Sequence, residues 1–183
     1  MAGAKEMREL GIRQRGDPVL GETCLRFDLP AEAELAVGVE RRLAVMIERL
    51  AGVHVFAKGM GLAAPQIGIP RAAAMLRPPD GRPPFLLLNP RVTERSAETD
   101  EQFEGCLSFF DVRGRVVRPV RITVAHAAVD GTPLVTRYET GMARLVLHEI
   151  DHLAGTLYAD RMSPGSRLIP LDEYREGGRA WEY

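Results

Sequence analysis

The feature that most constrains this chain is the sequence His148-Glu149-Ile150-Asp151-His152, near the C-terminal end of an apolar segment. Two histidines four residues apart share one helical face, about 40° from each other at 3.6 residues per turn. Both imidazoles then reach one metal ion, and Glu149 lies beside the first of them. A carboxylate there can take a proton from an attacking water. The motif predicts an interior helix that carries a catalytic metal site.

The residues around the motif support a buried helix. Apolar side chains occur on nearly every side of this segment, at Met142, Leu145, Val146, Leu147, Ile150 and Leu153. Thr140 is the expected N-cap, and Gly155 is the expected C-terminal stop. Two histidines and a carboxylate inside a core cost free energy unless they bind something. We therefore prefer a metal site to a pair of hydrogen-bonded core histidines.

The stretch from residue 71 to residue 139 has the pattern of β-strands. Expected strands cover 71–77, 85–93, 98–104, 112–118, 120–128 and 133–139, with turn sequences at 79–81 and 130–131. One N-terminal helix is expected before them, beginning at Asp28 or Leu29 with Pro30 in its first turn. Its apolar stripe is Leu35, Val39, Leu43, Met46, Ile47 and Leu50. Strands followed by a late helix indicate an α+β fold, with antiparallel β-sheets packed around the buried helix that carries the ligands.

Length, charge and composition limit the classes of function. A chain of 183 residues is expected to form a single catalytic domain, residues 1–183. A net charge of −1 with dispersed basic residues argues against nucleic-acid binding of its own. We expect no membrane association, because no apolar run approaches the roughly 18 residues of a membrane span. Two cysteines, Cys24 and Cys106, are too few for a disulfide scaffold, so a reducing cytoplasm is the expected location.

The identity of the third metal ligand is open on spacing alone. A catalytic zinc-type site needs three protein ligands and one open position. Tyr158 stands where metzincins have their third histidine, but a phenol with a pKa of about 10 is a poor ligand. Glu173 stands near the glutamate position of thermolysin-like enzymes, without the helical context that would aim it at the ion. Cys106 is the third candidate, because Gly105 permits an unusual backbone and a nearby metal would hold the thiol as thiolate.

Three motifs occur in order along the chain. They are Gly-x-Gly-Leu-Ala-Ala-x-Gln at Gly59–Gln66, Glu-Gly-Cys-Leu-Ser at Glu104–Ser108 and His-Glu-x-Asp-His at His148–His152. Together they make the chain resemble the peptide deformylases, and Gly16–Leu20 resembles the N-terminal segment of that family. Phe109-Phe110 replaces the Val-Pro or Ile-Pro often found after the cysteine motif, which affects the rim of the substrate site. The tail after Met162 differs from the helical extension of some members, and we expect the chain after Asp160 to pack over the surface with Trp181 as an anchor.

The resemblance implies a role for each motif. The implied metal ligands are Cys106, His148 and His152. Glu149 is implied as the general base and then the general acid. The side-chain amide of Gln66, otherwise a solvated loop amide, and the backbone N–H of Leu107 are implied as the oxyanion donors.

The resemblance also implies a reaction and its partners. The reaction is hydrolysis of the N-formyl group from the N-terminal methionine of newly made polypeptides, with release of formate. A Cys-His-His set suits zinc or iron(II), and the resemblance favours Fe²⁺, with Zn²⁺, Ni²⁺ or Co²⁺ as substitutes. We expect a monomer that associates transiently with the ribosome. Two rivals are a metallopeptidase using Glu173 and a metal-stabilised interaction domain; Glu149 argues against the second, because a structural site needs no base.

The substrate is expected to lie between the first and third motifs. An apolar slot for the methionine side chain is expected at Gly141 and Leu145, one turn before the ligands, with the stem of Arg144 nearby. The peptide would lie extended against Gly59 and Gly61 through backbone hydrogen bonds.

Two further acids are expected to support the ligands. Asp151 and Glu104 would act behind the histidines, held by Arg113 or Arg118. The alternative is that they form surface salt bridges that contribute little to the stability of the fold.

Overall fold

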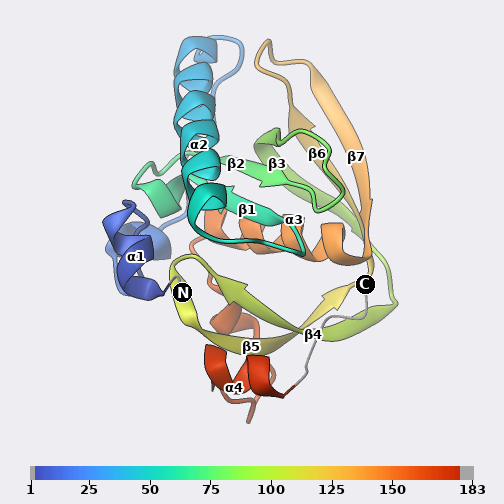
Figure 1. The fold of residues 1–183 in the computed structure, drawn as a ribbon. Helices are drawn as coiled ribbons and strands as arrows, with labels where there is room; N and C mark the ends of the chain where they lie inside the picture. The colour runs from blue at the N-terminus through green and yellow to red at the C-terminus, as the bar shows by residue number, and fades with distance from the viewer. Residues whose placement is uncertain (1–2, 178–183) are drawn as a thin grey trace.

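Two antiparallel β-sheets enclose the late helix α3 (Thr140–Leu153) in this computed structural model, which describes residues 3–177 (Figure 1). The five-stranded sheet has the order β1-β2-β3-β6-β7, with bounds β1 Met60–Ala63, β2 Ala73–Arg77, β3 Phe85–Arg95, β6 Arg121–Ala127 and β7 Pro133–Glu139. The second sheet has the order β4-β5-β8, with bounds β4 Thr99–Cys106, β5 Phe109–Pro119 and β8 Ile169–Pro170. All named strand pairs are antiparallel, which confirms the expected α+β class.

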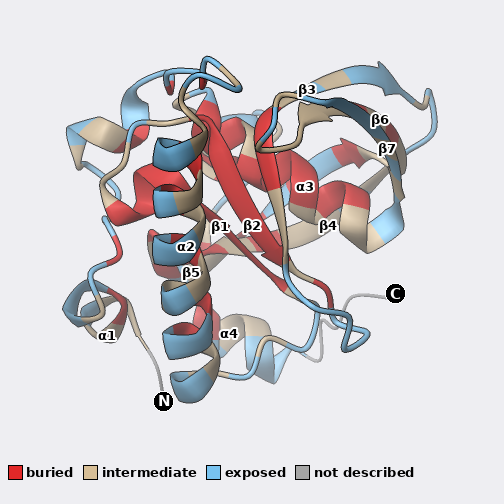
Figure 2. Cartoon of the chain, turned by 90° about the horizontal axis from the view of Figure 1, so that it is seen from above, coloured by how far each residue is buried: buried red, intermediate tan, exposed pale blue. Residues whose placement is uncertain are grey.

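The remaining elements cover the edges and ends of the sheets. The helices are α1 (Ala4–Glu9), α2 (Ala33–Val53) and α4 (Leu171–Glu176), and the 3₁₀ turns are η1 (Pro18–Gly21), η2 (Ala64–Ile67) and η3 (Tyr158–Arg161). Figure 2 shows that β1, β2 and α3 are mostly buried, whereas α2 leaves one face exposed.

Side chains of β2 point alternately to the two faces of the five-stranded sheet, and α2 and α3 pack on opposite faces. Ala73 and Met75 pack with the α2 residues Leu43 and Ile47, whereas Leu76 packs with Val146 of α3. Neighbouring strand residues point to opposite faces, so one short apolar strand serves both layers. Helix α3 is therefore covered on this side by the sheet and is held in the interior.

Of the two helix ends predicted for α3 from the sequence, the structure confirms only the C-terminal one. Gly155 adopts a left-handed backbone (φ +71°) just beyond Ala154, so it ends the helix as predicted. The predicted N-cap was wrong. Thr140 is already the first helical residue, and Glu139 precedes it without a side-chain cap. A reversed backbone at Thr140 (φ +49°) turns β7 directly into α3.

Helix α2 begins later than predicted, at Ala33 instead of Asp28 or Leu29. Residues 28–32 form a turn, closed by a hydrogen bond from the Asp28 N–H to the Glu32 carboxylate (2.7 Å). The predicted stripe is buried except at Leu35, which is exposed, and Met46, which is half-buried; Ala36 takes the core position next to Leu35.

The six predicted strands are all present, whereas several short elements were missed. Strand β1 escaped prediction because it has only four residues, two of them glycine and alanine, and α1, α4 and β8 are too short for a periodic signal. The tail after Met162 does contain a helix, α4. Trp181 lies outside the described residues. None of the helices within residues 3–177 has both the length and the apolar composition that a membrane crossing needs.

Candidate metal centre

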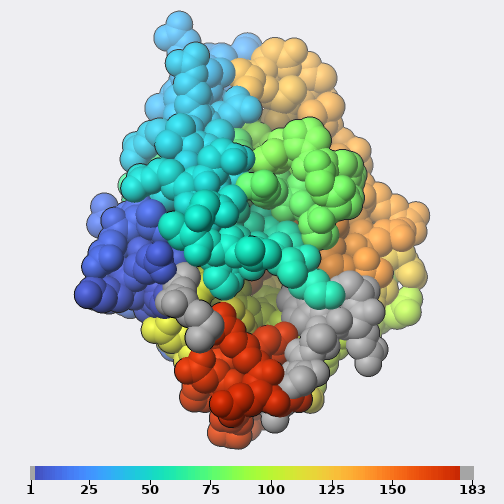
Figure 3. Space-filling view, in the orientation of Figure 1, coloured from blue at the N-terminus to red at the C-terminus, as the bar shows by residue number. Residues whose placement is uncertain are grey.

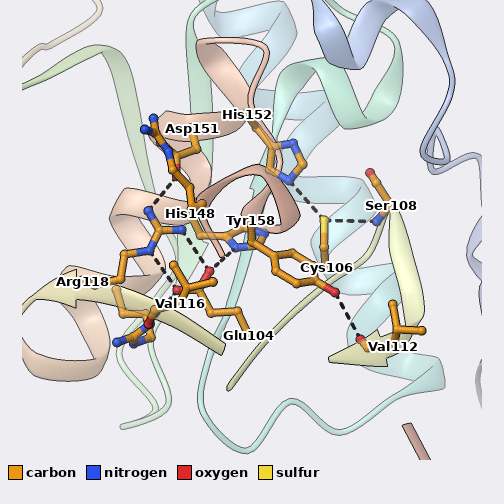
Figure 4. Close-up of polar contacts among 12 residues, drawn as sticks. Glu104, Cys106, Ser108, Val112, Val116, Arg118, His148, Asp151, His152 and Tyr158 are labelled. Atoms are coloured by element: carbon orange, nitrogen blue, oxygen red, sulfur yellow. Dashed lines mark hydrogen bonds and ion pairs between the residues drawn. The ribbon is translucent and has the colours of Figure 1, made fainter. Parts of the chain in front are cut away.

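Three donor side chains from two distant parts of the chain meet at one point. Cys106 is the last residue of β4, and His148 and His152 lie one turn apart on α3. Their donor atoms all lie within 4.8 Å of one another, and all three residues are buried. The Sγ of Cys106 is 3.1 Å from Nε2 of His152 (Figure 4). Two imidazoles and a sulfur at this spacing are arranged to bind one ion.

A tight hairpin places the sulfur. Cys106 pairs with Phe109, so Leu107 and Ser108 form the two-residue turn between β4 and β5. The register slips between Glu104 and Cys106, which puts the irregularity at Gly105. A Cβ built on Gly105 would lie 2.5 Å from Nε of Arg113, so glycine there makes room for this guanidinium.

The surroundings favour the thiolate form of Cys106. Burial alone would raise the pKa of the thiol, but the imidazoles, with His152 first, hold the pKa well below its ordinary value. The backbone N–H of Ser108 lies 3.4 Å from the sulfur, and the amide nitrogen of Gln66 lies 3.5 Å from it. A thiolate is the form that binds a metal.

A buried carboxylate orients the first histidine. Nδ1 of His148 lies 3.0 Å from Glu104, which leaves the other ring nitrogen for an ion. Arg118 holds this carboxylate with two parallel hydrogen bonds, 2.8 Å from Nε and 3.0 Å from Nη2. Its third nitrogen donates to Asp151 at 2.6 Å. Burial opposes ionisation of Glu104, but its bonds to His148 and Arg118 hold its pKa far below the ordinary value.

Of the two arginines considered from the sequence, Arg118 is therefore the one that holds Glu104 and Asp151. Two further arginines were missed in this role, Arg161, which donates to Asp151 at 2.8 Å, and Arg144, which binds Glu104. Arg144, only 1% exposed, donates to Glu104 at 2.7 Å and to Asp100 at 2.7 Å. Its position four residues before His148 on α3 places it on the same face, and this spacing was the available signal.

Arg118→Met is expected to destabilise both the fold and the metal site. Removal of one partner from a buried ion pair costs about 3–5 kcal/mol of unfolding free energy. Loss of a group that orients a ligand lowers metal affinity by about 10–100-fold. Arg115→Met on the same strand removes an exposed pair with Glu101 and a contact of the guanidinium with the Phe103 ring (5.0 Å to its centre), and is expected to cost about 1 kcal/mol. Equal urea midpoints and equal metal affinities for the two variants would contradict the assigned role of Arg118.

Glu149 is buried beside the three donor residues. It is 2% exposed, and within residues 3–177 no group hydrogen-bonds its Oε2. Burial raises the pKa of its carboxyl above the ordinary value. A Cβ built on Gly61 would lie 2.5 Å from Cδ of Glu149, so only glycine leaves room for this side chain at β1. The carboxylate is thus held in place by packing, with one oxygen available to a ligand.

The amide of Gln66 is oriented by its own backbone turn. Its Oε1 accepts a hydrogen bond from the Ala63 N–H at 2.9 Å, which turns the NH₂ group toward Ser108 Oγ (3.2 Å) and the Cys106 sulfur. Gln66 is 1% exposed, so it is not the solvated loop amide that its sequence alone suggested. Leu107 is also buried, at the first position of the hairpin turn.

A cleft opens onto these residues between β1 and the β4–β5 hairpin, with α3 as its floor. Residues of all three parts line it: Phe56, Lys58, Gly59, Met60, Gly61, Gln66, Glu104, Gly105, Cys106, Leu107, Phe110, Arg113, Arg144, Leu145, His148 and Glu149. Gly59, Gly61 and Leu145, expected at the substrate, line it. Gly141 is not among the described lining residues, whereas Arg144, whose stem was expected nearby, is one of them.

The two phenylalanines that depart from the family pattern point to different places. Phe110 lines the cleft and also packs in the main core. Phe109 packs beside Tyr158 and under the guanidinium of Arg15, 4.5 Å from its ring centre. Only Phe110 can therefore affect the rim of the cleft.

The alternative ligands are engaged elsewhere. The Tyr158 hydroxyl donates to the Val112 carbonyl at 3.4 Å. Glu173 forms an ion pair with Arg167 at 2.9 Å. The metallopeptidase hypothesis, which needs Glu173 as the third metal ligand, is therefore not supported. Cys24 is a free thiol, so it forms no disulfide with Cys106.

A thiolate and two imidazoles that converge beside a buried carboxylate are typical of metal-dependent hydrolases. Comparison with known proteins makes the class specific. The family model described as "Polypeptide deformylase" matches residues 10–168. The peptide deformylase of Thermotoga maritima is 35% identical over 158 residues, 86% of this chain and 90% of that protein. That of Natranaerobius thermophilus is 33% identical over 150 residues, 82% of this chain and 90% of that protein.

Comparison with solved structures indicates the same family. The crystal structure of the Thermotoga maritima peptide deformylase has a TM-score of 0.72 at 34% identity, covering 84% of this chain and 97% of that chain. A Met-Ala-Ser-bound class I type b peptide deformylase from Acinetobacter baumannii has a TM-score of 0.72 at 28% identity, covering 82% and 96%. The chain belongs to the polypeptide deformylase family. The activity of this family is removal of the N-formyl group from new polypeptides, which makes the chain a metal-binding hydrolase of protein biosynthesis.

Proposed function

We propose that residues 1–183 act as one catalytic domain in which Cys106, His148 and His152 hold a single divalent ion and Glu149 moves the proton. The observation that carries this proposal is the meeting of the three donor atoms within 4.8 Å, beside the Glu149 carboxylate. Three protein ligands leave one position open, as catalytic sites require.

The donor set fits an ion of intermediate softness. The buried thiolate and the two ring nitrogens suit zinc or iron(II). Glu104 supports this fit, because its bond to Nδ1 of His148 fixes the ring in an orientation that presents the other nitrogen. We propose Fe²⁺ as the resident ion, with Zn²⁺, Ni²⁺ or Co²⁺ as substitutes. A divalent ion there would polarise the formyl carbonyl and lower the pKa of the attacking water.

The protein residues then divide the proton and charge movements. Glu149 accepts the proton of the attacking water and delivers it to the leaving amine nitrogen. Its raised pKa and its burial suit a group that must take up and release a proton in turn. As the carbonyl oxygen becomes anionic, the Gln66 amide and the Leu107 N–H donate hydrogen bonds to it.

Gln66→Ala is expected to lower kcat by about 10²–10³-fold, because loss of one oxyanion donor has that effect in other hydrolases. KM and metal content are expected to change little, since the donor acts mainly in the transition state. Gln102→Ala, on the far part of β4, is the matched control and should retain full kcat. A Gln66→Ala enzyme within threefold of the parent kcat would rule out this role.

The substrate is the formyl-methionyl N-terminus of a nascent polypeptide. We propose that the peptide adds as a strand along β1, which is the edge strand of its sheet and lines the cleft at Gly59 and Gly61. Leu145 and the stem of Arg144 would contact the methionine side chain, with Gly141 one turn before them. Backbone recognition would allow one enzyme to act on many sequences.

The same substrate suggests where the enzyme acts and which partners it meets. We propose a cytoplasmic monomer that meets nascent chains through transient association with the ribosome and has no nucleic-acid binding of its own. The net charge of −1 supports the last point.

Formate release is the direct test of the activity. The metal-loaded enzyme is expected to release formate from formyl-Met-Ala-Ser and to leave acetyl-Met-Ala-Ser intact, because a site closed around a hydrogen substituent rejects a methyl group. Cleavage of an internal peptide bond, or hydrolysis of both acyl groups at equal rates, would refute the proposed reaction.

A further inference from the structure

Residues 12–15, which belong to none of the three sequence motifs, lie against both turns that carry the proposed oxyanion donors. The Arg13 N–H donates a hydrogen bond to the Gln66 carbonyl in η2 at 2.8 Å. The Arg15 N–H donates one to the Ser108 carbonyl in the turn between β4 and β5, also at 2.8 Å. One short stretch of backbone therefore ties together two turns that are far apart in the sequence.

The half-buried side chain of Gln14 adds a third bond to the hairpin turn. Its Nε2 donates to the Leu107 carbonyl at 3.3 Å and to the Ile12 carbonyl at 3.0 Å. The Leu107 carbonyl belongs to the peptide unit directly after the residue whose N–H is the proposed donor. Because peptide units are planar and rotate as rigid bodies, this bond restricts rotation at Leu107 and with it the orientation of the Leu107 N–H.

The segment that makes these bonds is itself anchored on both sides. Ile12 is 2% exposed and belongs to the same core cluster as Leu107. Just after the segment, the Asp17 carboxylate caps η1. Just before it, the Ala4 N–H at the start of α1 donates to the Asp111 carboxylate at 2.8 Å, and Figure 3 shows the blue N-terminal residues beside the yellow residues at the start of β5. The segment can therefore hold the two turns in a fixed relation.

The relation between the two turns matters because two donors must reach one oxygen atom. The turns already touch through the bond from the Gln66 amide to the Ser108 hydroxyl at 3.2 Å. An oxyanion is stabilised by donors about 2.7–3.1 Å from it. A displacement of about 1 Å at a reacting centre can cost about 10²-fold in rate, even when its cause lies outside the site.

We propose that Gln14 is a positioning residue for deformylation, which holds the Gln66 and Leu107 donors at the spacing that one oxyanion requires. The backbone N–H groups of Arg13 and Arg15 act with it. Gln14 is not among the described residues that line the cleft, so it acts through the two turns and not on the substrate. This proposal rests on the proposed function, because it assumes that both groups are oxyanion donors.

The test is Gln14→Met in the metal-loaded enzyme, since methionine keeps the length of the side chain but has no N–H to donate. Its kcat for formyl-Met-Ala-Ser is expected to fall about 3–10-fold, the size of one lost hydrogen bond. KM and metal content are expected to stay at the parent values, because Gln14 contacts neither the peptide nor the ion. Gln102→Met makes the same exchange on β4 and should keep the parent kcat.

A second variant, Gln14→Glu, separates positioning from a general loss of stability. An ionised carboxylate has no donor and faces the same two carbonyls, so kcat is expected to fall at least as far as in Gln14→Met. Urea midpoints are measured for both variants, and kcat is measured where each variant is fully folded. A merely structural role would lower the midpoint and leave kcat unchanged.

Parent kcat in both Gln14 variants, or a change in KM alone, would overturn the positioning role while leaving deformylation intact. A fall in kcat matched by loss of metal would overturn it as well, because Gln14 would then act on the ion site. Failure of the parent enzyme to release formate would instead overturn the proposed function.

Discussion

Glu149→Gln is expected to lower kcat for formyl-Met-Ala-Ser by about 10²–10⁴-fold with the metal still bound, because general acid–base catalysis contributes an effect of that size. The amide has nearly the shape of the carboxylate, so the packing against Gly61 is kept. It cannot accept the proton of the attacking water or return one to the leaving nitrogen. The measurement is formate release under saturating peptide, with metal content determined on the same samples.

Glu173→Gln is the matched control for this substitution. Glu173 is a half-exposed glutamate of α4 that, within residues 3–177, pairs with Arg167, and its replacement should leave kcat and metal content unchanged. A Glu149→Gln enzyme with parental kcat would remove Glu149 from the mechanism. A fall in kcat matched by loss of metal would assign it to binding the ion instead.

Cys106→Ala is expected to abolish stoichiometric metal binding and, with it, deformylation. The substitution removes the thiolate, which is the one anionic ligand of the set, and leaves two imidazoles that cannot complete a three-ligand site. Metal content by elemental analysis after anaerobic purification is the primary readout, with activity as the second.

Cys24→Ala controls for the loss of a buried cysteine. Cys24 is 6% exposed and packs among small apolar residues, and burial raises the pKa of its thiol to about 11, so it remains protonated. This variant should retain metal and activity. Full metal content in Cys106→Ala would favour a rival site such as one using Glu173, and metal loss in Cys24→Ala would show that the effect is not specific.

Much of the metal centre could be predicted from the sequence, because several of its residues are close together in the chain. The two histidines and Glu149 lie within five residues, so helical geometry alone placed the two imidazoles on one face with the carboxylate beside them. The strands were readable from alternation, and α2 from its stripe. The helix boundaries were predicted less accurately. The starts expected near Asp28 and at Thr140 depend on backbone turns that local residue preferences do not determine.

Contacts between distant segments were not readable from periodicity. Only the resemblance to peptide deformylases chose Cys106 over Tyr158 and Glu173, because which strand end meets α3 is a property of the tertiary structure. Arg144 was given no part in holding Glu104, since a buried arginine is rare unless paired and its partner lies 40 residues away.

Two glycines show the same limit in detail. Neither Gly61 nor Gly105 is in the left-handed backbone region, and each leaves space for a side chain from another element, Glu149 and Arg113 respectively. The sequence marked these positions as special but attributed them to backbone freedom or to substrate approach. Their reason lies in which side chain packs over them, and only the tertiary arrangement shows it.

X-ray absorption at the metal edge of the loaded enzyme tests most directly that one sulfur and two imidazoles hold a single ion. The arrangement of Cys106, His148 and His152 predicts one sulfur neighbour at about 2.3 Å and imidazole nitrogens at about 2.0–2.1 Å when zinc is bound, with the sulfur absent in Cys106→Ala. A spectrum with only nitrogen and oxygen neighbours in the parent enzyme would contradict it.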